Sequence, residues 1–242
     1  PALARPLPPL LTRLEGDPPR ASRMFGVVGD GPALGAIDAL AAGPGGRRLG
    51  VLRRRGLGLL RGLRRTVLDL AELSAPSALT LTGGEGFAGV VADRDADRVF
   101  AVRPSGRLEP LPDPAETAGR GFEAPVALGA DDKGAVWVLD AAPPALFRFA
   151  EGTWTLPRAE LGLARAGSFA LAEQTVFVLD GPRVRQVSLR DGRSTIRAEL
   201  DRPLELAASP DGLFALLAGG RVVRVGRAGE AEVVASAARG RS

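Results

Sequence analysis

Short apolar runs that stop at a turn recur five times along the chain. Successive runs lie 40, 47, 40 and 37 residues apart, measured at their last positions, which are Arg53, Asp93, Asp140, Asp180 and Leu217. A regular period between about 20 and 50 residues is typical of repeat architectures, in which each unit buries its apolar surface against the next. The pattern therefore predicts a repeated unit rather than one irregular core.

Each unit divides into four short strands. The segment from 126 to 156 shows this best, with strands predicted at Val126–Ala130, Ala135–Leu139, Leu146–Phe149 and Thr153–Leu156. The turns between strands are rich in Asp and Gly, and Gly accepts the positive φ that tight hairpins need. Four-stranded units that repeat about every 40 residues are typical of β-propeller blades, which pack face to face around an axis. We therefore expect an all-β fold, a β-propeller of five recognisable four-stranded blades.

The ends of the chain set the expected domain boundaries. Residues 1–35 are rich in proline, which opposes long helices, so they form either an arm or a degenerate sixth blade. The propeller is expected over 36–237, followed by a basic tail at 238–242. The first unit is the weakest of the five, because its arginine-rich stretch 53–65 also fits a basic helix. A long connection at 112–125 accounts for the single 47-residue spacing.

Two segments resemble a known group of propellers. Ala130–Asp140 and Ala208–Leu216 both pass through a turn with Asp and Gly into an apolar strand that contains an aromatic residue. This pattern resembles blades of the NHL/lactonase-like group, and the resemblance covers about 36–237. It implies either a binding module or a hydrolase. Lactonases of that group hold a divalent metal with Glu, Asn and Asp from the inner strands, but this chain has no Asn, so that ligand set cannot be transferred.

Composition excludes several kinds of chemistry. The chain has no Cys and no His, which rules out thiolate nucleophiles, Ser-His-Asp triads and His-dependent lyase or metal sites. Its net charge of +4 comes almost wholly from Arg, and the abundance of Arg, Ala, Gly and Pro is typical of a GC-rich bacterial genome. No apolar run approaches the roughly 18 residues of a membrane helix, and the first residues make a poor signal peptide. We therefore expect a cytoplasmic protein or part of a complex assembled there.

Carboxylates near the expected inner strands are the candidate metal ligands. Asp38, Glu123 and Glu205 could converge on a divalent ion such as Ca²⁺, which requires several oxygen ligands. The favoured alternative is that they are ordinary carboxylates in loops or at the mouth of a channel. We therefore expect no cofactor, with a Ca²⁺ site as the alternative.

A second set of aspartates recurs at one position of the unit. Asp93, Asp140 and Asp180 each end the second strand. Aspartate at a strand end commonly accepts backbone hydrogen bonds and starts a turn. Because the position recurs from unit to unit, we expect a structural role rather than a ring of ligands. Trp137 and Trp154, both in one unit, are expected in the core rather than in a ligand cage.

The basic stretch of the first unit is the candidate partner surface. Its arginines are Arg53, Arg54, Arg55, Arg61, Arg64 and Arg65. Nucleic-acid sites usually add aromatic side chains on which bases stack. This stretch has no aromatic residue, so a solvated face or a face that contacts another protein is expected instead of a nucleic-acid site.

Two functions remain after these exclusions. The sequence favours a non-catalytic β-propeller that binds other proteins as a structural component of a larger assembly, such as a phage-tail-like or injection-system complex. The alternative is a lactonase-like metal-dependent hydrolase with an atypical carboxylate site. The hydrolase requires Asp38, Glu123 and Glu205 to converge at one end of the channel, whereas the binding module does not.

Overall fold

The structure is a computed structural model that describes the backbone of four strands between Ala39 and Asp69, and residues 73–82, 87–209 and 211–236 with their side chains. The strands of this part of the chain form five four-stranded antiparallel sheets. The first sheet contains β1 (Ala39–Ala42), β2 (Arg48–Arg53), β3 (Gly56–Arg61) and β4 (Arg64–Asp69). Because β3 lies inside the stretch 53–65, the basic-helix alternative for that stretch is wrong.

The other four sheets follow one another along the chain. The second sheet contains β5 (Pro76–Thr80), β6 (Gly89–Asp93), β7 (Arg98–Val102) and β8 (Leu108–Pro110). The third contains β9 (Pro125–Ala130), β10 (Val136–Ala141), β11 (Pro144–Ala150) and β12 (Thr153–Arg158). The fourth contains β13 (Ala166–Ala172), β14 (Thr175–Asp180), β15 (Arg183–Ser188) and β16 (Ser194–Glu199). The fifth contains β17 (Pro203–Ser209), β18 (Gly212–Leu217), β19 (Arg221–Val225) and β20 (Ala231–Ser236).

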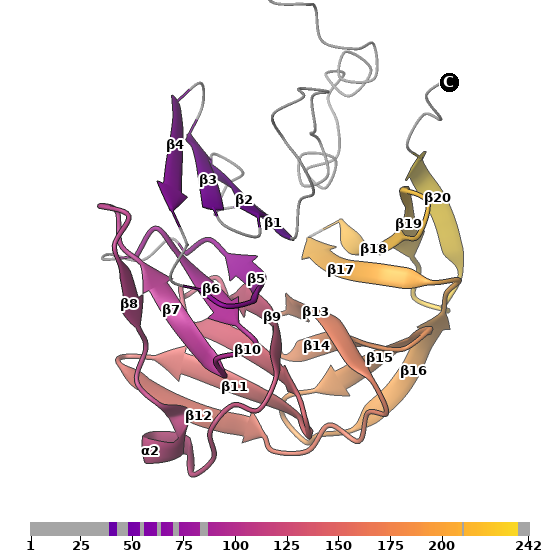
Figure 1. Ribbon diagram of the computed structural model, residues 1–242. Coiled ribbons are helices and arrows are strands. Elements are labelled where there is room, and N and C mark those ends of the chain that lie inside the picture. The colour runs from indigo at the N-terminus through magenta and orange to yellow at the C-terminus, as the bar shows by residue number, and fades with distance from the viewer. Residues whose placement is uncertain are drawn as a thin grey trace, which may run out of the picture.

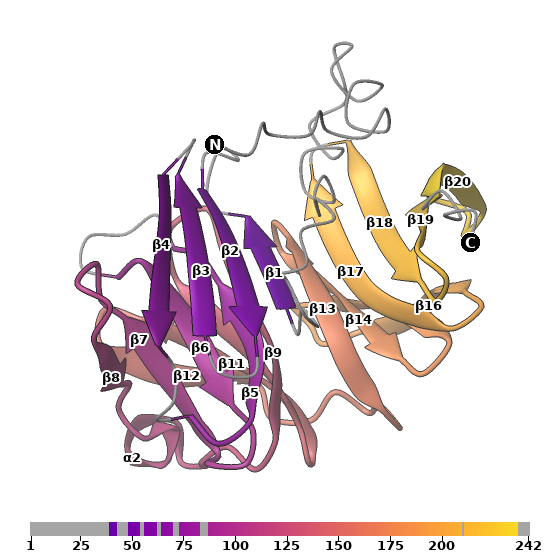
Figure 2. The same cartoon turned by 45° about the horizontal axis from the view of Figure 1, so that its top comes forward.

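The four sheets from β5 to β20 are arranged around a common axis as the blades of a β-propeller (Figure 1). The first strand of each sheet is innermost and the fourth is outermost, and the inner strands β5, β9, β13 and β17 lie next to one another in that order. Figure 2 shows β13 and β14 of one blade beside β17 and β18 of the next. The chain therefore completes each blade from the axis outward before it begins the next, as in other propellers.

The structure shows four blades with their side chains, β5–β8 to β17–β20, rather than the expected five or six. The sheet β1–β4, of which only the backbone is described, lies beside β5 (Figure 1). Its sequence also departs from the repeat, since Arg53 stands where three other units have an aspartate. A sixth blade would fall on residues 1–35, and these lie outside the described residues.

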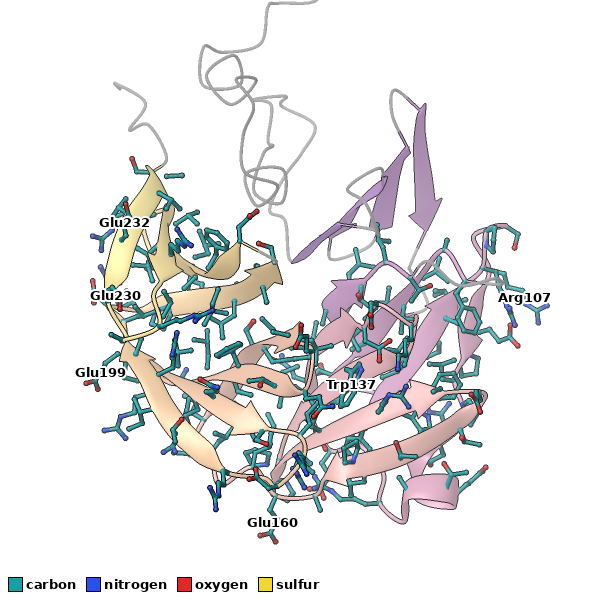
Figure 3. All side chains as sticks on the ribbon, turned by 180° about the vertical axis from the view of Figure 1, so that it is seen from behind. Arg107, Trp137, Glu160, Glu199, Glu230 and Glu232 are labelled. Atoms are coloured by element: carbon teal, nitrogen blue, oxygen red, sulfur yellow. The ribbon has the colours of Figure 1, made fainter. Side chains whose placement is uncertain are left out.

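The cores lie between neighbouring blades, because each sheet buries both faces. Between β5–β8 and β9–β12 the core is aromatic: the Phe122 ring meets those of Phe147 and Trp154 edge-on, with centroids 4.8 and 5.1 Å away. Between β13–β16 and β17–β20 the fully buried residues are aliphatic. Trp137 and Trp154 are 7% and 1% exposed, which confirms the expected core positions, and Figure 3 shows Trp137 in the interior.

The connection 112–125 contains a short helix that the sequence analysis did not predict, α2 (Pro114–Ala118). The Asp113 side chain caps its first turn, and Gly119, with φ of 75°, ends it in the left-handed conformation. The Trp154 indole N–H donates to the Pro112 carbonyl at 2.7 Å, so the connection is fixed to β12. Within the described residues no helix is long and apolar enough to cross a membrane.

Candidate functional site

Three buried aspartates hold the start of the inner strands at one end of the propeller. In each of three blades, the carboxylate at the end of the second strand accepts hydrogen bonds of 2.6–3.0 Å from the two backbone amides just before the first strand. The sets are Asp93 with Ser74 and Ala75, Asp140 with Glu123 and Ala124, and Asp180 with Ala164 and Arg165. The aspartates are at most 6% exposed. The predicted structural role is therefore confirmed.

Two of these aspartates also bind an arginine. Arg120 donates to Asp140 at 3.0 Å, and Arg185 donates to Asp180 at 2.8 Å. Burial raises the pKa of Asp140 above its ordinary value, although its backbone donors and Arg120 act in the opposite direction. At Asp180 desolvation also raises the pKa, but the amide donors and Arg185 outweigh it, so the pKa lies below the ordinary value. Arg120 and Arg185 are thus committed to internal carboxylates.

A β-bulge follows the first residue of each inner strand. Ser77, Val126 and Leu204 are extra residues in the pairing of their strands, and in β13 the shift lies between Ala166 and Phe169, which includes Gly167. Bulges re-aim side chains and are common next to functional sites. The second residue of all four inner strands is therefore irregular at the same end of the axis.

This end of the axis contains an open cavity of about 460 Å³, which we call the axial cavity. Its lining comes from β5, β9 and β13 and the segments beside them: Ala75, Pro76, Ser77, Arg94, Val126, Arg165, Ala166 and Gly167. The Ser77 hydroxyl donates to the Pro125 carbonyl at 2.8 Å, and that bond links β5 to β9. A nucleophilic serine needs an adjacent base, and none of the other lining residues can act as one.

The two arginines of the lining differ from Arg120 and Arg185. Among the described residues, the only ionic contact of Arg94 is with Asp95 at 3.7 Å, in which both side chains are more than half exposed, and such surface pairs are worth little. Arg165 makes no ion pair with any carboxylate of the described residues, and its side chain is exposed. Guanidinium groups donate several hydrogen bonds in a fixed plane and suit carboxylate or phosphate ligands. The axial cavity is therefore suited to an anion rather than to a metal cation.

The predicted metal ligands are placed as follows. Glu123 is exposed and lies just before β9, and Glu205 lies in β17, with β13 between these two strands. Glu205 is also exposed to solvent. The surrounding atoms nevertheless desolvate its carboxyl in part, and this raises the pKa of Glu205 above its ordinary value. Asp38 lies outside the described residues. Where side chains are described, no three carboxylates gather closely enough to hold a metal ion.

The predicted partner arginines belong to the first sheet. Arg53 ends β2, Arg61 ends β3, and Arg64 and Arg65 begin β4. Arg54 and Arg55 lie outside the described residues. Neither Arg94 nor Arg165 was predicted from the sequence, although Arg94 directly follows a recurring strand-end aspartate.

Comparisons with known proteins support the fold. No family model and no curated protein matches the chain. Among solved structures, the chain resembles the nidogen/laminin complex with a TM-score of 0.66 at 17% identity, over 79% of this chain and 76% of that one. It resembles a gluconolactonase of Xanthomonas campestris with a TM-score of 0.66 at 19% identity, over 81% and 74% of the two chains.

A third similar structure is a catalytically inactive histidine-to-alanine variant of virginiamycin B lyase from Staphylococcus aureus. Its TM-score is 0.59 at 14% identity, over 81% of this chain and 69% of that one. The present chain has no histidine at all. At these identities the likeness concerns the fold alone. The chain has the fold of the NHL/lactonase-like β-propellers.

Proposed function

We propose that the chain is a non-catalytic binding module, that the axial cavity is its binding site, and that it serves as a structural component of a larger protein assembly. The observation that supports this most is the lining of the axial cavity. Arg94 and Arg165 repel a metal cation, and Ser77 has no neighbouring base in the lining. Propellers commonly carry function in loops and strand ends held by a rigid scaffold.

The similar structures do not choose between binding and catalysis. One is a propeller in a protein complex, the nidogen/laminin complex, whereas the others are described as a gluconolactonase and a lyase. A lactonase-like hydrolase therefore stays the alternative, and it would need a metal site that includes Asp38. Binding by the proposed module requires no metal, so EDTA should leave it unchanged.

The test is a pull-down of the tagged protein from its native lysate, followed by mass spectrometry and particle sizing. We expect stoichiometric capture of a defined set of larger proteins, weakened in the double variant Arg94→Ala, Arg165→Ala. Arg107→Ala is the matched control, because Arg107 is exposed in the β7–β8 turn at the opposite end of β7 from Arg94 (Figure 3). Recovery of a lone 25.0 kDa chain would contradict the proposal. Lactone hydrolysis that requires Ca²⁺ would favour the hydrolase.

A further inference from the structure

The two arginines of the axial cavity are anchored at the backbone, and within the described residues their guanidinium groups make at most one weak surface ion pair. The Arg94 amide donates to the Ala75 carbonyl at 3.1 Å, next to the buried Asp93. The Arg165 amide donates to Asp180 at 2.9 Å, and its carbonyl accepts from Gly181 at 3.2 Å. Fixing the backbone in this way lowers the conformational entropy lost when the guanidinium groups bind a ligand.

These arginines approach the cavity from two different blades. Arg94 follows β6 in the β5–β8 blade and Arg165 precedes β13 in the β13–β16 blade, so that β9 and its bulge residue Val126 lie between them. Two guanidinium groups that line one cavity from different blades can both donate to a single carboxylate. The exposed Asp95 is the only described carboxylate that contacts either of them, and at 3.7 Å it competes weakly.

The rest of the lining is apolar or small. Pro76, Val126 and Ala166 form the wall, and Gly167 leaves space. At the equivalent bulge of the next inner strand, Leu204 is 59% exposed. A ligand that bears only a charge would leave this apolar surface in water.

We infer that the axial cavity binds a carboxylate joined to a short apolar group. The carboxylate lies between Arg94 and Arg165, and the apolar group lies against Val126 and Ala166, on the side of Leu204. This inference takes its site from the proposed function, but it concerns the chemistry of the ligand and is tested separately.

The experiment is an NMR titration of the whole chain with hexanoate, a carboxylate with a short apolar tail. We expect saturable shifts at the amides of Ser77, Val126 and Gly167. Hexylamine, which has the opposite charge, should give none, and 1-hexanol should bind about tenfold more weakly because it lacks the ionic hydrogen bonds. Equal affinity for hexanoate and 1-hexanol, or shifts confined to other surfaces, would overturn the inference.

Two variants remove the site by different means. Arg94→Ala with Arg165→Ala removes the charge and should weaken hexanoate binding by about tenfold or more. Gly167→Leu fills the space beside Gly167. The chain should tolerate this substitution, because a Cβ at position 167 meets only the Leu179 Cβ, at an ordinary distance of 3.9 Å, and the backbone has no positive φ there. Arg107→Ala should bind hexanoate like the unchanged chain, and equal weakening in that control would also overturn the inference.

The pull-down separates the two sources of such a carboxylate. If excess hexanoate releases the captured proteins, the cavity holds an acidic side chain or chain end of the partner. If hexanoate binds but releases nothing, the ligand is a free small acid, and the inference stands without the partner. If neither the unchanged chain nor Gly167→Leu binds hexanoate, and both capture the assembly equally well, the inference fails. The chain would then still be a binding module, but its assembly would use a surface other than the axial cavity.

Discussion

At the scale of the residue, apolar side chains of the blade β17–β20 occupy the positions that the ion pair of Asp180 and Arg185 occupies in the blade β13–β16. The register of the two blades places Leu217 at the position of Asp180 and Val223 at that of Arg185. We expect Asp180→Leu to destabilise the chain because it leaves Arg185 without its carboxylate. Adding Arg185→Val should recover part of the loss, since removing one partner of a buried pair costs more than replacing both. Urea unfolding of the two single variants and the double variant should show a coupling of about 0.5–3 kcal/mol; additive losses would contradict it.

The same aspartate should contribute to the dependence of stability on pH. The pKa of Asp180 is lowered in the fold, so the folded chain binds fewer protons there than the unfolded chain does. Its stabilisation is therefore complete above the ordinary pKa and is lost as the pH falls through the folded value. The difference in unfolding free energy between the unchanged chain and Asp180→Asn should shrink from about pH 6 to about pH 3. A difference that stays constant over this range would show that the carboxylate charge is not what stabilises the site.

At the scale of the element, Trp154 joins the connection 112–125 to its blade. Its indole donates to the Pro112 carbonyl at 2.7 Å, and its backbone amide donates to the Thr117 hydroxyl of α2 at 3.1 Å. Trp154→Phe keeps an aromatic ring beside Phe122 but leaves the Pro112 carbonyl without its donor, which should cost about 1–3 kcal/mol. Limited proteolysis should then cut this connection faster. Thr117→Val, which removes the other bond only, is the comparison, and unchanged proteolysis in Trp154→Phe would mean that α2 is held by something else.

The sequence predicted elements better than their irregularities. The strands and the role of Asp93, Asp140 and Asp180 were predictable because they recur and depend on local chemistry. The helix α2 was missed although Asp113, Pro114 and Gly119 mark its two ends, since five residues give no apolar period. The bulges could not be predicted, because register is a relation between two strands. Arg94 and Arg165 line the same cavity because each lies at a strand end of a different blade, a proximity that follows only from the arrangement of the blades around the axis.

At the scale of the whole molecule, protection from solvent falls from the middle of each blade to the last outer strand. Val90, Val138 and Val178, in three second strands, are 0% exposed, whereas all six residues of β20 are exposed, with Val233 at 55%. Figure 3 shows Glu230 and Glu232 pointing outward there.

The number of blades was harder to predict than the blades themselves. Periodicity identifies the repeated unit, but it does not show how the first and last units close the ring.

Hydrogen exchange of the whole chain measures this gradient. Amides of the second strands should exchange only through global unfolding, and those on the outer edge of β20 should exchange fastest, because that edge has no partner strand in its sheet. The Trp154 amide is the control, since it lies in an outer strand yet is bonded to Thr117. Protection of β20 that grows with protein concentration would mean that copies pair along this edge. Protection that appears only with the captured partner would place the partner on β20, and the axial cavity would then not be the site that the assembly uses.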